Sequence, residues 1–224
     1  MKTICYYFLL FMTYSVLGWI LEVSCKLVEK KKFINRGFLI GPYCPIYGWG
    51  ALMMTLLLKK YLNDIFTLFI MNILICSILE YFTSYFLEVI FKARWWDYSN
   101  KKFNINGRIC LETMIPFGLF GLLVMYVINP IIFNILNMIP ISIIYFISIV
   151  LFLLLLIDTI TSYSIITKIK NINKKTQSHI LLKKDNTEKI TLLVKKELLN
   201  SHNKYYNRLI NSFPHIKFKF FNKK

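Results

Sequence analysis

The pattern of apolar and polar positions divides the chain into five apolar runs and a polar remainder that begins near residue 168. A helix that crosses a bilayer needs about 20 mainly apolar residues, and several runs reach that length. The first run exceeds a signal-peptide core and precedes no small-residue cleavage site, so we expect it to be retained. The pattern predicts an all-α fold, a polytopic membrane helix bundle of about five transmembrane helices. The expected spans are Ile4–Cys25, Ile46–Leu58, Ile65–Phe91, Ile109–Ile128 and Ile141–Ile166.

Composition supports a membrane protein and changes how its charge is interpreted. Of the 224 residues, 56% are hydrophobic, and the mean hydropathy is +0.52, which is too apolar for a soluble domain of this size. The formal net charge of +17 would suggest a nucleic-acid partner in a soluble protein. In a membrane protein it favours a fixed topology and attraction to anionic lipids. We therefore expect no nucleic-acid partner and a multi-pass location in the cell membrane.

Lysine and arginine are distributed unevenly among the connections. The first connection, residues 26–40, and the third, residues 92–108, hold five each, and the tail from Lys168 holds fifteen. These segments together carry 25 of the 28 basic residues. Basic residues are enriched in cytoplasmic segments of membrane proteins. Five spans with the amino end outside and the carboxyl tail in the cytoplasm satisfy this rule throughout.

The sequence GPYCPIYGWG at residues 41–50 is unusual for a regular lipid-facing helix. Pro42 and Pro45 remove backbone donors, and the glycines permit turns and close approach. Irregular backbone at membrane depth is tolerated only where protein or water covers it. Two readings remain open, a helix-entry or re-entrant segment packed inside the bundle and a proline-rich helix start at the interface.

Residues 168–224 are expected to form a second unit, a basic cytoplasmic tail, beside the transmembrane bundle of residues 1–167. Apolar residues in the tail recur on one helical face and predict an amphipathic helix, which lies on anionic lipid or docks on the bundle. Pro214 should end this helix and leave a basic end, HIKFKFFNKK. The apolar face consists of Ile190, Val194, Leu198, Tyr205, Leu209 and Phe213.

Acids and arginines gather on the side of the bundle predicted to be cytoplasmic. Glu80 and Glu88 differ by about 80° around one helix axis, so they share a polar face. Charged groups in spans are costly unless they pair or reach water. We expect a cytoplasm-open polar cavity that binds a charged ligand; the alternative is a structural ion-pair network without a ligand. The candidate ligand-binding residues are Glu22, Arg36, Glu80, Glu88, Arg94, Asp97, Arg108 and Glu112, with Asp158 placed deeper.

The stretch from Arg94 to Glu112, RWWDYSNKKFNINGRICLE, is too rich in charged and aromatic residues for a plain connection. Trp95 and Trp96 are expected to be interfacial anchors. An acid at Glu112 also suits a helix start, because it faces the positive end of the helix dipole. We interpret the stretch as one wall of the polar cavity.

Candidate chemistry outside this region is sparse. The five cysteines have no CxxC spacing and mostly lie in or beside apolar runs, so we interpret them as small buried hydrophobic residues. The three histidines are scattered through the tail. We therefore expect no metal site, no cofactor and no established catalytic signature, which leaves enzymatic activity unsupported rather than excluded.

Several long motifs are similar to those of one family. These are GWILE, NRGFLIGPYCPIYGWG, LEYFTSYFLE, RWWDYSNKKFNINGRICLE and the later RLINSFP. Together they resemble the bacterial putative ABC-transporter type IV membrane proteins, also called CmpB-like and commonly named putative ABC transporter permeases. The resemblance is dense over residues 17–112 and carries over no substrate and no catalytic residue. It places Glu22, Arg36, Pro42, Pro45, Glu80, Arg94, Trp95, Trp96, Asp97, Tyr98, Gly107 and Arg108 at motif positions.

Three functions follow as hypotheses. The first is a permease subunit of a transport system, with a separate ATPase subunit because the sequence has no GxxxxGK[ST] motif, and with a homo- or hetero-oligomer completing the pore. The second is a membrane enzyme acting on a lipid headgroup, in which arginines hold a phosphate and Asp97, Glu80 or Glu88 acts as base or metal ligand. The third is a non-catalytic scaffold or regulator whose basic tail docks partners or lipid.

Overall fold

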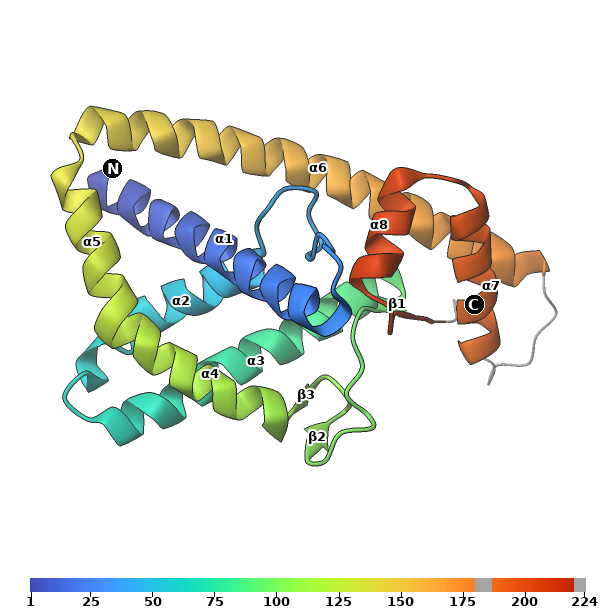
Figure 1. Ribbon diagram of the computed structural model, residues 1–224, viewed down its shortest axis with the longest axis horizontal. Coiled ribbons are helices and arrows are strands. Elements are labelled where there is room, and N and C mark those ends of the chain that lie inside the picture. The colour runs from blue at the N-terminus through green and yellow to red at the C-terminus, as the bar shows by residue number, and fades with distance from the viewer. Residues whose placement is uncertain (180–186, 220–224) are drawn as a thin grey trace.

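The computed structural model describes residues 1–179 and 187–219, and 76% of the chain is helical. Four helices are long and apolar enough to cross a membrane, and they form a bundle with the tail at one end (Figure 1). The all-α membrane bundle predicted from the sequence is therefore confirmed. The four helical segments are Lys2–Lys30, Ile65–Phe91, Leu111–Met138 and Ile141–Ser178.

The second expected span has its predicted length, within one residue of the predicted position, but it is too short to cross a bilayer by itself. Helix α1 is Lys2–Lys30, whereas α2 is only Pro45–Leu57, 13 residues, or about 20 Å of helix. The hydrocarbon core of a bilayer is about 30 Å thick, so α2 alone does not cross it. The prediction of a helix over Ile46–Leu58 was close in position, and this helix is a shorter apolar element beside the four long candidate spans. Pro45 begins α2 because the first turn of a helix needs no donor from that residue.

Residues 37–44, which we call the inserted loop, pack inside the bundle. The Cys44 amide donates to the carbonyl oxygen of Ser15, near the middle of α1, at 2.8 Å. Leu39 and Cys44 are buried. The backbone amides of Ile40 and Gly41 both donate to the side chain of Asp158 on α6. The structure therefore agrees with the first alternative, a segment packed inside the bundle, and α2 starts from there.

Helix α3, Ile65–Phe91, has the bounds that the apolar pattern predicted. It follows a short 3-10 turn, η1 (Lys59–Tyr61), and begins after Asp64. The Asp64 side chain accepts hydrogen bonds from the amide and hydroxyl of Thr67 at 3.1 and 2.5 Å. An aspartate in this capping position satisfies amides that the first turn leaves free. Lys92 ends the helix in a left-handed conformation, with φ 54°.

The fourth span is longer than predicted. Helix α4 is Leu111–Leu123, and the chain continues through a π-helical turn, η2 (Val124–Ile128), into α5, Asn129–Met138. The uncharged segment expected to be a connection is thus helical up to Met138. Prolines usually interrupt a helix, but Pro130 lies in the first turn of α5, and the π-turn before it accommodates the change in hydrogen bonding.

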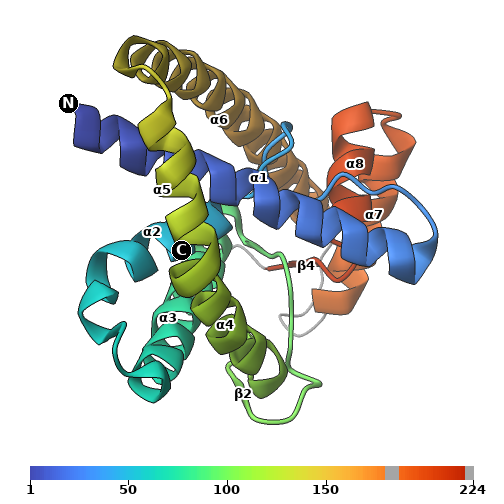
Figure 2. The same cartoon turned by 60° about the vertical axis from the view of Figure 1, so that its left-hand side comes forward.

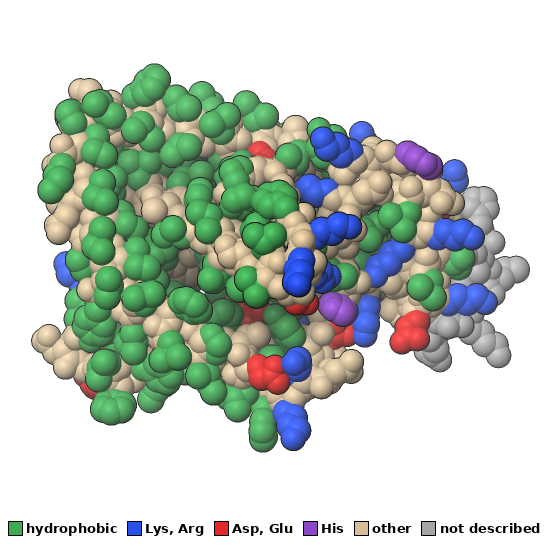
Figure 3. Space-filling view, viewed as in Figure 1, with side chains coloured by type: hydrophobic (Ala, Val, Ile, Leu, Met, Phe, Trp, Pro, Cys, Tyr) green, Lys and Arg blue, Asp and Glu red, His purple; other side chains and the backbone are tan. Residues whose placement is uncertain are grey.

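Helix α6, Ile141–His179, is the longest element and runs along one edge of the molecule (Figure 1). It continues without a break through residue 168, where the sequence pattern placed the start of the tail. Large side chains on α6, such as Phe146, Ile149 and Ile160, are exposed. In Figure 3, hydrophobic side chains cover the part of the surface formed by the helices, and Lys and Arg side chains gather around the tail. This division is expected for helices that face lipid.

The tail folds into two helices rather than the single amphipathic helix predicted. They are α7, Thr187–Asn200, and α8, Lys204–Ser212. Asn203 separates them because its side chain accepts from the amides of Tyr205 and Tyr206 and so starts a new helix. Both helices pack beside the end of α6 (Figure 2). The basic end is described only to Lys219; residues 220–224 lie outside the described residues.

The tail is joined to the bundle by strand pairing and by an apolar core. Strand β4, Lys217–Phe218, pairs antiparallel with β1, Ala93–Arg94, directly after α3. A second pair, β2 (Asn104–Ile105) with β3 (Ile109–Cys110), lies in the same connection. We call the end of the bundle formed by residues 92–110 and 187–219 the polar end. Its buried core includes Phe91, Trp95, Ile166, Ile190, Val194, Leu198, Leu209 and Phe218.

Candidate functional site

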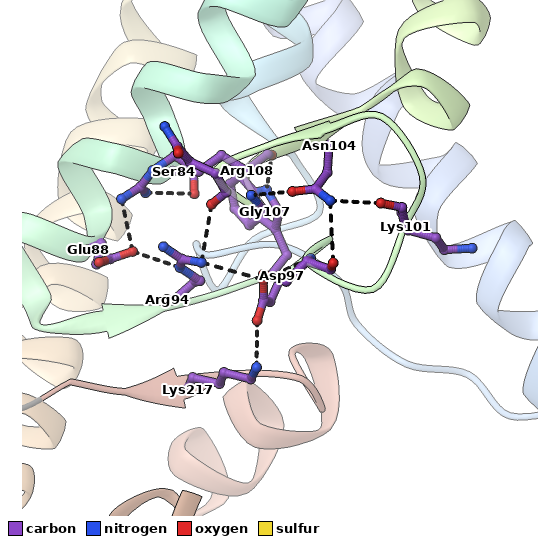
Figure 4. A network of polar contacts seen from close by, with 12 residues as sticks. Ser84, Glu88, Arg94, Asp97, Lys101, Asn104, Gly107, Arg108 and Lys217 are labelled. Atoms are coloured by element: carbon purple, nitrogen blue, oxygen red, sulfur yellow. Dashed lines mark hydrogen bonds and ion pairs between the residues drawn. The ribbon is translucent and has the colours of Figure 1, made fainter. Parts of the chain in front are cut away.

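Glu88 is the centre of an ion-pair cluster at the polar end (Figure 4). Its Oε2 atom lies 2.9 Å from Nε of Arg94 and 3.1 Å from Nη2 of Arg108, and its Oε1 atom lies 3.6 Å from Nζ of Lys219. The side chains of Glu88, Arg94 and Arg108 are mostly buried. Two guanidinium groups on one carboxylate reduce the cost of burying each charge.

Arg108 is held on its remaining sides by α3. Its Nη1 donates to the hydroxyl of Ser84 at 3.2 Å, and its guanidinium lies 5.7 and 5.3 Å from the ring centroids of Tyr81 and Tyr85. A guanidinium over an aromatic face is attracted by the ring electrons. Arg108 therefore has its charge and its donors engaged within the protein.

Asp97 joins this cluster to the tail. Its Oδ1 atom lies 3.4 Å from Nη1 of Arg94 and its Oδ2 atom lies 2.6 Å from Nζ of Lys217 in β4. Burial would raise the pKa of the Asp97 carboxyl, but hydrogen bonds from Lys217 and Ser99 outweigh it. The pKa is held well below its usual value, so the carboxylate is ionised at neutral pH.

The loop that presents Asp97 depends on Gly107. This residue has φ 64°, and a Cβ atom there would lie 2.4 Å from Ser99 Oγ and 2.5 Å from Asp97 Oδ1. Its amide donates to Asn104 Oδ1 at 2.9 Å, and its carbonyl oxygen accepts from the Tyr98 amide at 2.8 Å. Only glycine combines this backbone conformation with this space.

Both tryptophans make contacts within the polar end, and their role as interfacial anchors stays a prediction. Trp95 is only 3% exposed and packs between Phe38 and Phe213, with ring centroids 5.3 and 5.0 Å away. Trp96 donates from Nε1 to the Arg108 carbonyl oxygen at 3.1 Å. Aromatic residues beside a span fit both an interface and a protein core, and here the tail covers Trp95.

Glu22 and Arg36 form an ion pair of their own. Arg36 Nε lies 3.1 Å from Glu22 Oε2, and the hydroxyl of Tyr47 donates to Glu22 Oε1 at 2.7 Å. The pair connects α1 to the segment before the inserted loop and to α2. Neither residue pairs with the cluster around Glu88.

Asp158 and Arg208 both hydrogen-bond to backbone atoms of the inserted loop. Besides the amides of Ile40 and Gly41, at 2.9 and 2.7 Å, Asp158 accepts from the hydroxyl of Tyr43 at 2.6 Å. Arg208 of α8 donates to the carbonyl oxygen of Leu39 at 2.7 Å. Sequence reasoning missed Arg208, although it opens the RLINSFP motif; its partners are backbone atoms, which leave no pattern in the sequence.

Glu80 and Glu112 complete the predicted set and lie in contrasting surroundings. Glu80 is 8% exposed and accepts from the hydroxyl of Tyr98 at 3.3 Å. Glu112 is exposed and pairs with Lys101 at 2.8 Å, apart from the other acids. Pro42 lies within the inserted loop and Pro45 begins α2. The structure thus brings Glu88, Arg94, Asp97 and Arg108 together, places Glu22 with Arg36, and leaves Glu112 outside.

Comparison with known proteins gives one match. A family model described as Putative ABC-transporter type IV matches residues 9–163. The match covers most of α1 through the greater part of α6 and includes the cluster around Glu88, but not α7 or α8. No curated protein and no solved structure matches the chain.

Proposed function

The chain belongs to the putative ABC-transporter type IV family, as its motifs predicted, and from this premise we propose that it is the permease subunit of a transport system. The match over residues 9–163 carries the proposal, because this range comprises the apolar helices rather than the tail. The sequence contains no GxxxxGK[ST] motif, so we assign ATP hydrolysis to a separate subunit.

The topology in this proposal has the amino end outside and the polar end in the cytoplasm. The distribution of basic residues supports it, since 25 of the 28 fall in the first and third connections and the tail. The fifth crossing is assigned to the inserted loop together with α2. The loop hydrogen-bonds to Ser15 and Asp158, so its irregular backbone is covered by protein, as membrane depth requires.

Within this framework the charged residues divide into two roles. The cluster around Glu88 organises the polar end, because both of its arginines are engaged by carboxylates. Glu22 on α1 accepts a hydrogen bond from Tyr47 on α2, and Glu80 on α3 lies near both residues. We assign these three residues to the ligand-facing side of the proposed cytoplasm-open cavity. An enzyme that holds a lipid phosphate with Arg94 and Arg108 has less support, because Glu88 already binds both guanidinium groups.

Purification and reconstitution test the proposal. The full chain, isolated in mild detergent from its own cells, should bring down an ATPase subunit in fixed stoichiometry, and a tagged unrelated multi-span protein should not. Vesicles holding both proteins should show ATP hydrolysis that depends on the chain and uptake that depends on ATP. Repeated purification without an ATPase partner, together with vesicles that show no flux, would refute the permease assignment.

A further inference from the structure

The last turns of α1 keep an exposed apolar face beyond the length that crosses a bilayer. About 20 residues of helix span the 30 Å hydrocarbon core, and α1 has 29 residues. A helix that enters the hydrocarbon at Ile4 leaves it near Ser24, so Leu27 and Val28 follow in the headgroup layer. The exposed apolar side chains on this face of α1 are Leu17, Ile20, Leu21, Leu27 and Val28, the last by 82%. The lipid-facing side of α1 thus continues into the headgroup layer.

The charged side chains at this end of α1 lie on the opposite face and are paired. Lys26 follows Leu17 by nine residues, which places it about 180° away around the helix. Lys26 pairs with Glu29, and Glu22 pairs with Arg36. A helix end with one charged face and one exposed apolar face is suited to the membrane interface.

The chain turns back along α1 after the helix ends. Lys31 closes the helix in a left-handed conformation, with φ 49°. Asn35 Oδ1 then accepts from Trp19 Nε1 at 2.7 Å, and the Phe33 ring meets the Trp19 ring edge to face, with centroids 6.3 Å apart. Trp19 lies about 16 Å before Lys30 along the helix. The turn therefore returns Phe33, which is 66% exposed, to the level of the apolar span.

Three consecutive lysines stand between the helix end and the returning segment. Lys30, Lys31 and Lys32 are exposed, and their ammonium groups form no hydrogen bond and no ion pair with any residue that the structure describes. The neighbouring acid, Glu29, is already paired with Lys26. The interfacial patch is our name for this surface, which consists of Leu27, Val28, Lys30, Lys31, Lys32 and Phe33.

The tail uses its apolar face within the protein. The sequence left two partners open for that face, anionic lipid and the bundle. Ile190, Val194 and Leu198 are fully buried in the core of the polar end, so insertion of this face into lipid would require the tail to undock. The interfacial patch is instead a basic surface whose apolar neighbours remain exposed at the end of a span.

We propose that the interfacial patch binds an anionic phospholipid. The three lysines hold the phosphate of the headgroup, and the acyl chains lie against Leu27, Val28 and Phe33. Basic side chains beside a span attract anionic headgroups, and aromatic rings favour the same depth. A neutral lipid would leave the lysines unpaired, and a free phosphate would leave the apolar side chains uncovered. The proposal holds whether or not the chain is a permease.

Native mass spectrometry of the full chain tests the site. The chain is purified in a mild detergent and equilibrated with equal amounts of phosphatidylglycerol and phosphatidylcholine, and the lipid retained by each protein molecule is counted. Each lysine near an anionic headgroup contributes about fivefold, so phosphatidylglycerol should be preferred by at least about tenfold. Equal retention of the two lipids would overturn the proposal.

Two matched double variants locate the bound lipid. Lys31→Gln/Lys32→Gln should lower the preference for phosphatidylglycerol at least about fivefold. Lys174→Gln/Lys175→Gln removes the same charge from two consecutive exposed lysines at the end of α6, and should keep the preference. A preference that survives in the first variant, or that falls equally in both, would contradict the interfacial patch.

A substitution without a charge change tests the apolar part of the patch. Phe33→Ala should lower retention of phosphatidylglycerol at least about threefold, because less apolar surface contacts the acyl chains. Phe103→Ala, at another exposed phenylalanine, should leave retention unchanged. Glycerol phosphate carries the headgroup charge without acyl chains, so an excess of it should not displace the lipid. Displacement by glycerol phosphate, together with full retention in Phe33→Ala, would reduce the patch to an anion site and overturn the lipid assignment.

Discussion

Asp97 and Lys217 are 120 residues apart in the chain, and their side chains form an ion pair with a distance of 2.6 Å. The pair joins the connection after α3 to β4. We expect Asp97→Asn and Lys217→Ala each to loosen the tail, because either change leaves the other charge without its partner. Since the Lys217 side chain is 46% exposed, the coupling should be about 0.5–1.5 kcal/mol. Chymotrypsin cleavage at the tail aromatics should then be about three- to tenfold faster.

A double-mutant cycle isolates this pair. In the double variant Asp97→Asn/Lys217→Ala the tail should be cleaved little faster than in either single variant, because the two substitutions remove the same interaction. Lys196→Ala, which changes an exposed lysine on α7, should leave cleavage unchanged. Fully additive effects of the two single changes would mean that the ion pair does not hold the tail.

Docking of the tail should weaken in acid. The Asp97 pKa is lowered when the tail is docked, whereas a free aspartate has a pKa of about 3.9. The ionised carboxylate therefore stabilises docking fully above that value, and the contribution is lost as pH falls below it towards the docked pKa. Pepsin cleavage of the tail, measured from pH 5 down to pH 2.5, should accelerate more steeply in the unmodified chain than in Asp97→Asn. Parallel cleavage-against-pH profiles for the two chains would exclude Asp97 as the group responsible for weaker docking in acid.

Gly107→Ala should destabilise the polar end. The substitution places a Cβ atom within 2.5 Å of Ser99 and Asp97 oxygens at a backbone φ of 64°. We expect a loss of about 2 kcal/mol or more, seen as a Tm lower by roughly 4–8 °C in detergent. Gly50→Ala is the matched control, because the nearest heavy atom to a Cβ there is 3.7 Å away. Similar Tm values for the two variants would show that the loop relaxes around Gly107.

Asp158→Asn should release the inserted loop. The carboxylate binds the amides of Ile40 and Gly41, and hydrogen bonds to a charged group contribute about 1.5–3 kcal/mol each. Buried Cys44, kept as the only cysteine, should then react with maleimide at least about tenfold faster. Thr159→Ala removes a nearby exposed hydroxyl that bonds only its own helix, and its reaction rate should match that of the parent. Equal rates for Asp158→Asn would place the loop's anchor elsewhere.

Sequence patterns predicted the elements that local forces determine. Helix α3 was predicted with its observed bounds, because Asp64 caps its start and a long apolar run continues to Phe91. The second helix was predicted within one residue of its bounds, but its apolar run does not report how far the preceding loop enters the bundle. The fourth was underestimated because asparagines and a proline suggest a turn, whereas Asn129 is buried and its side chain binds Tyr14 and Thr55.

The sequence predicted which residues belong to the candidate site but not which of them pair with one another. Glu88, Arg94, Asp97 and Arg108 share a segment rich in charge, and the structure brings them together. Their partner Lys217 is one of fifteen basic residues from Lys168 onward, and nothing local distinguishes it from the others. Arg208 and Asp158 act on backbone atoms of the inserted loop, and such contacts depend on tertiary structure alone.

Strand β1 and the Trp95 face are covered by residues 190–218, which leave the ribosome about a hundred residues after β1 itself. During synthesis the helices can insert into the membrane before residues 190–218 cover this face. A chain interrupted before α8 would therefore display Trp95, Phe91 and an open strand edge to the quality-control machinery of the cell. The polar end can therefore be completed only after residues 190–218 have been made.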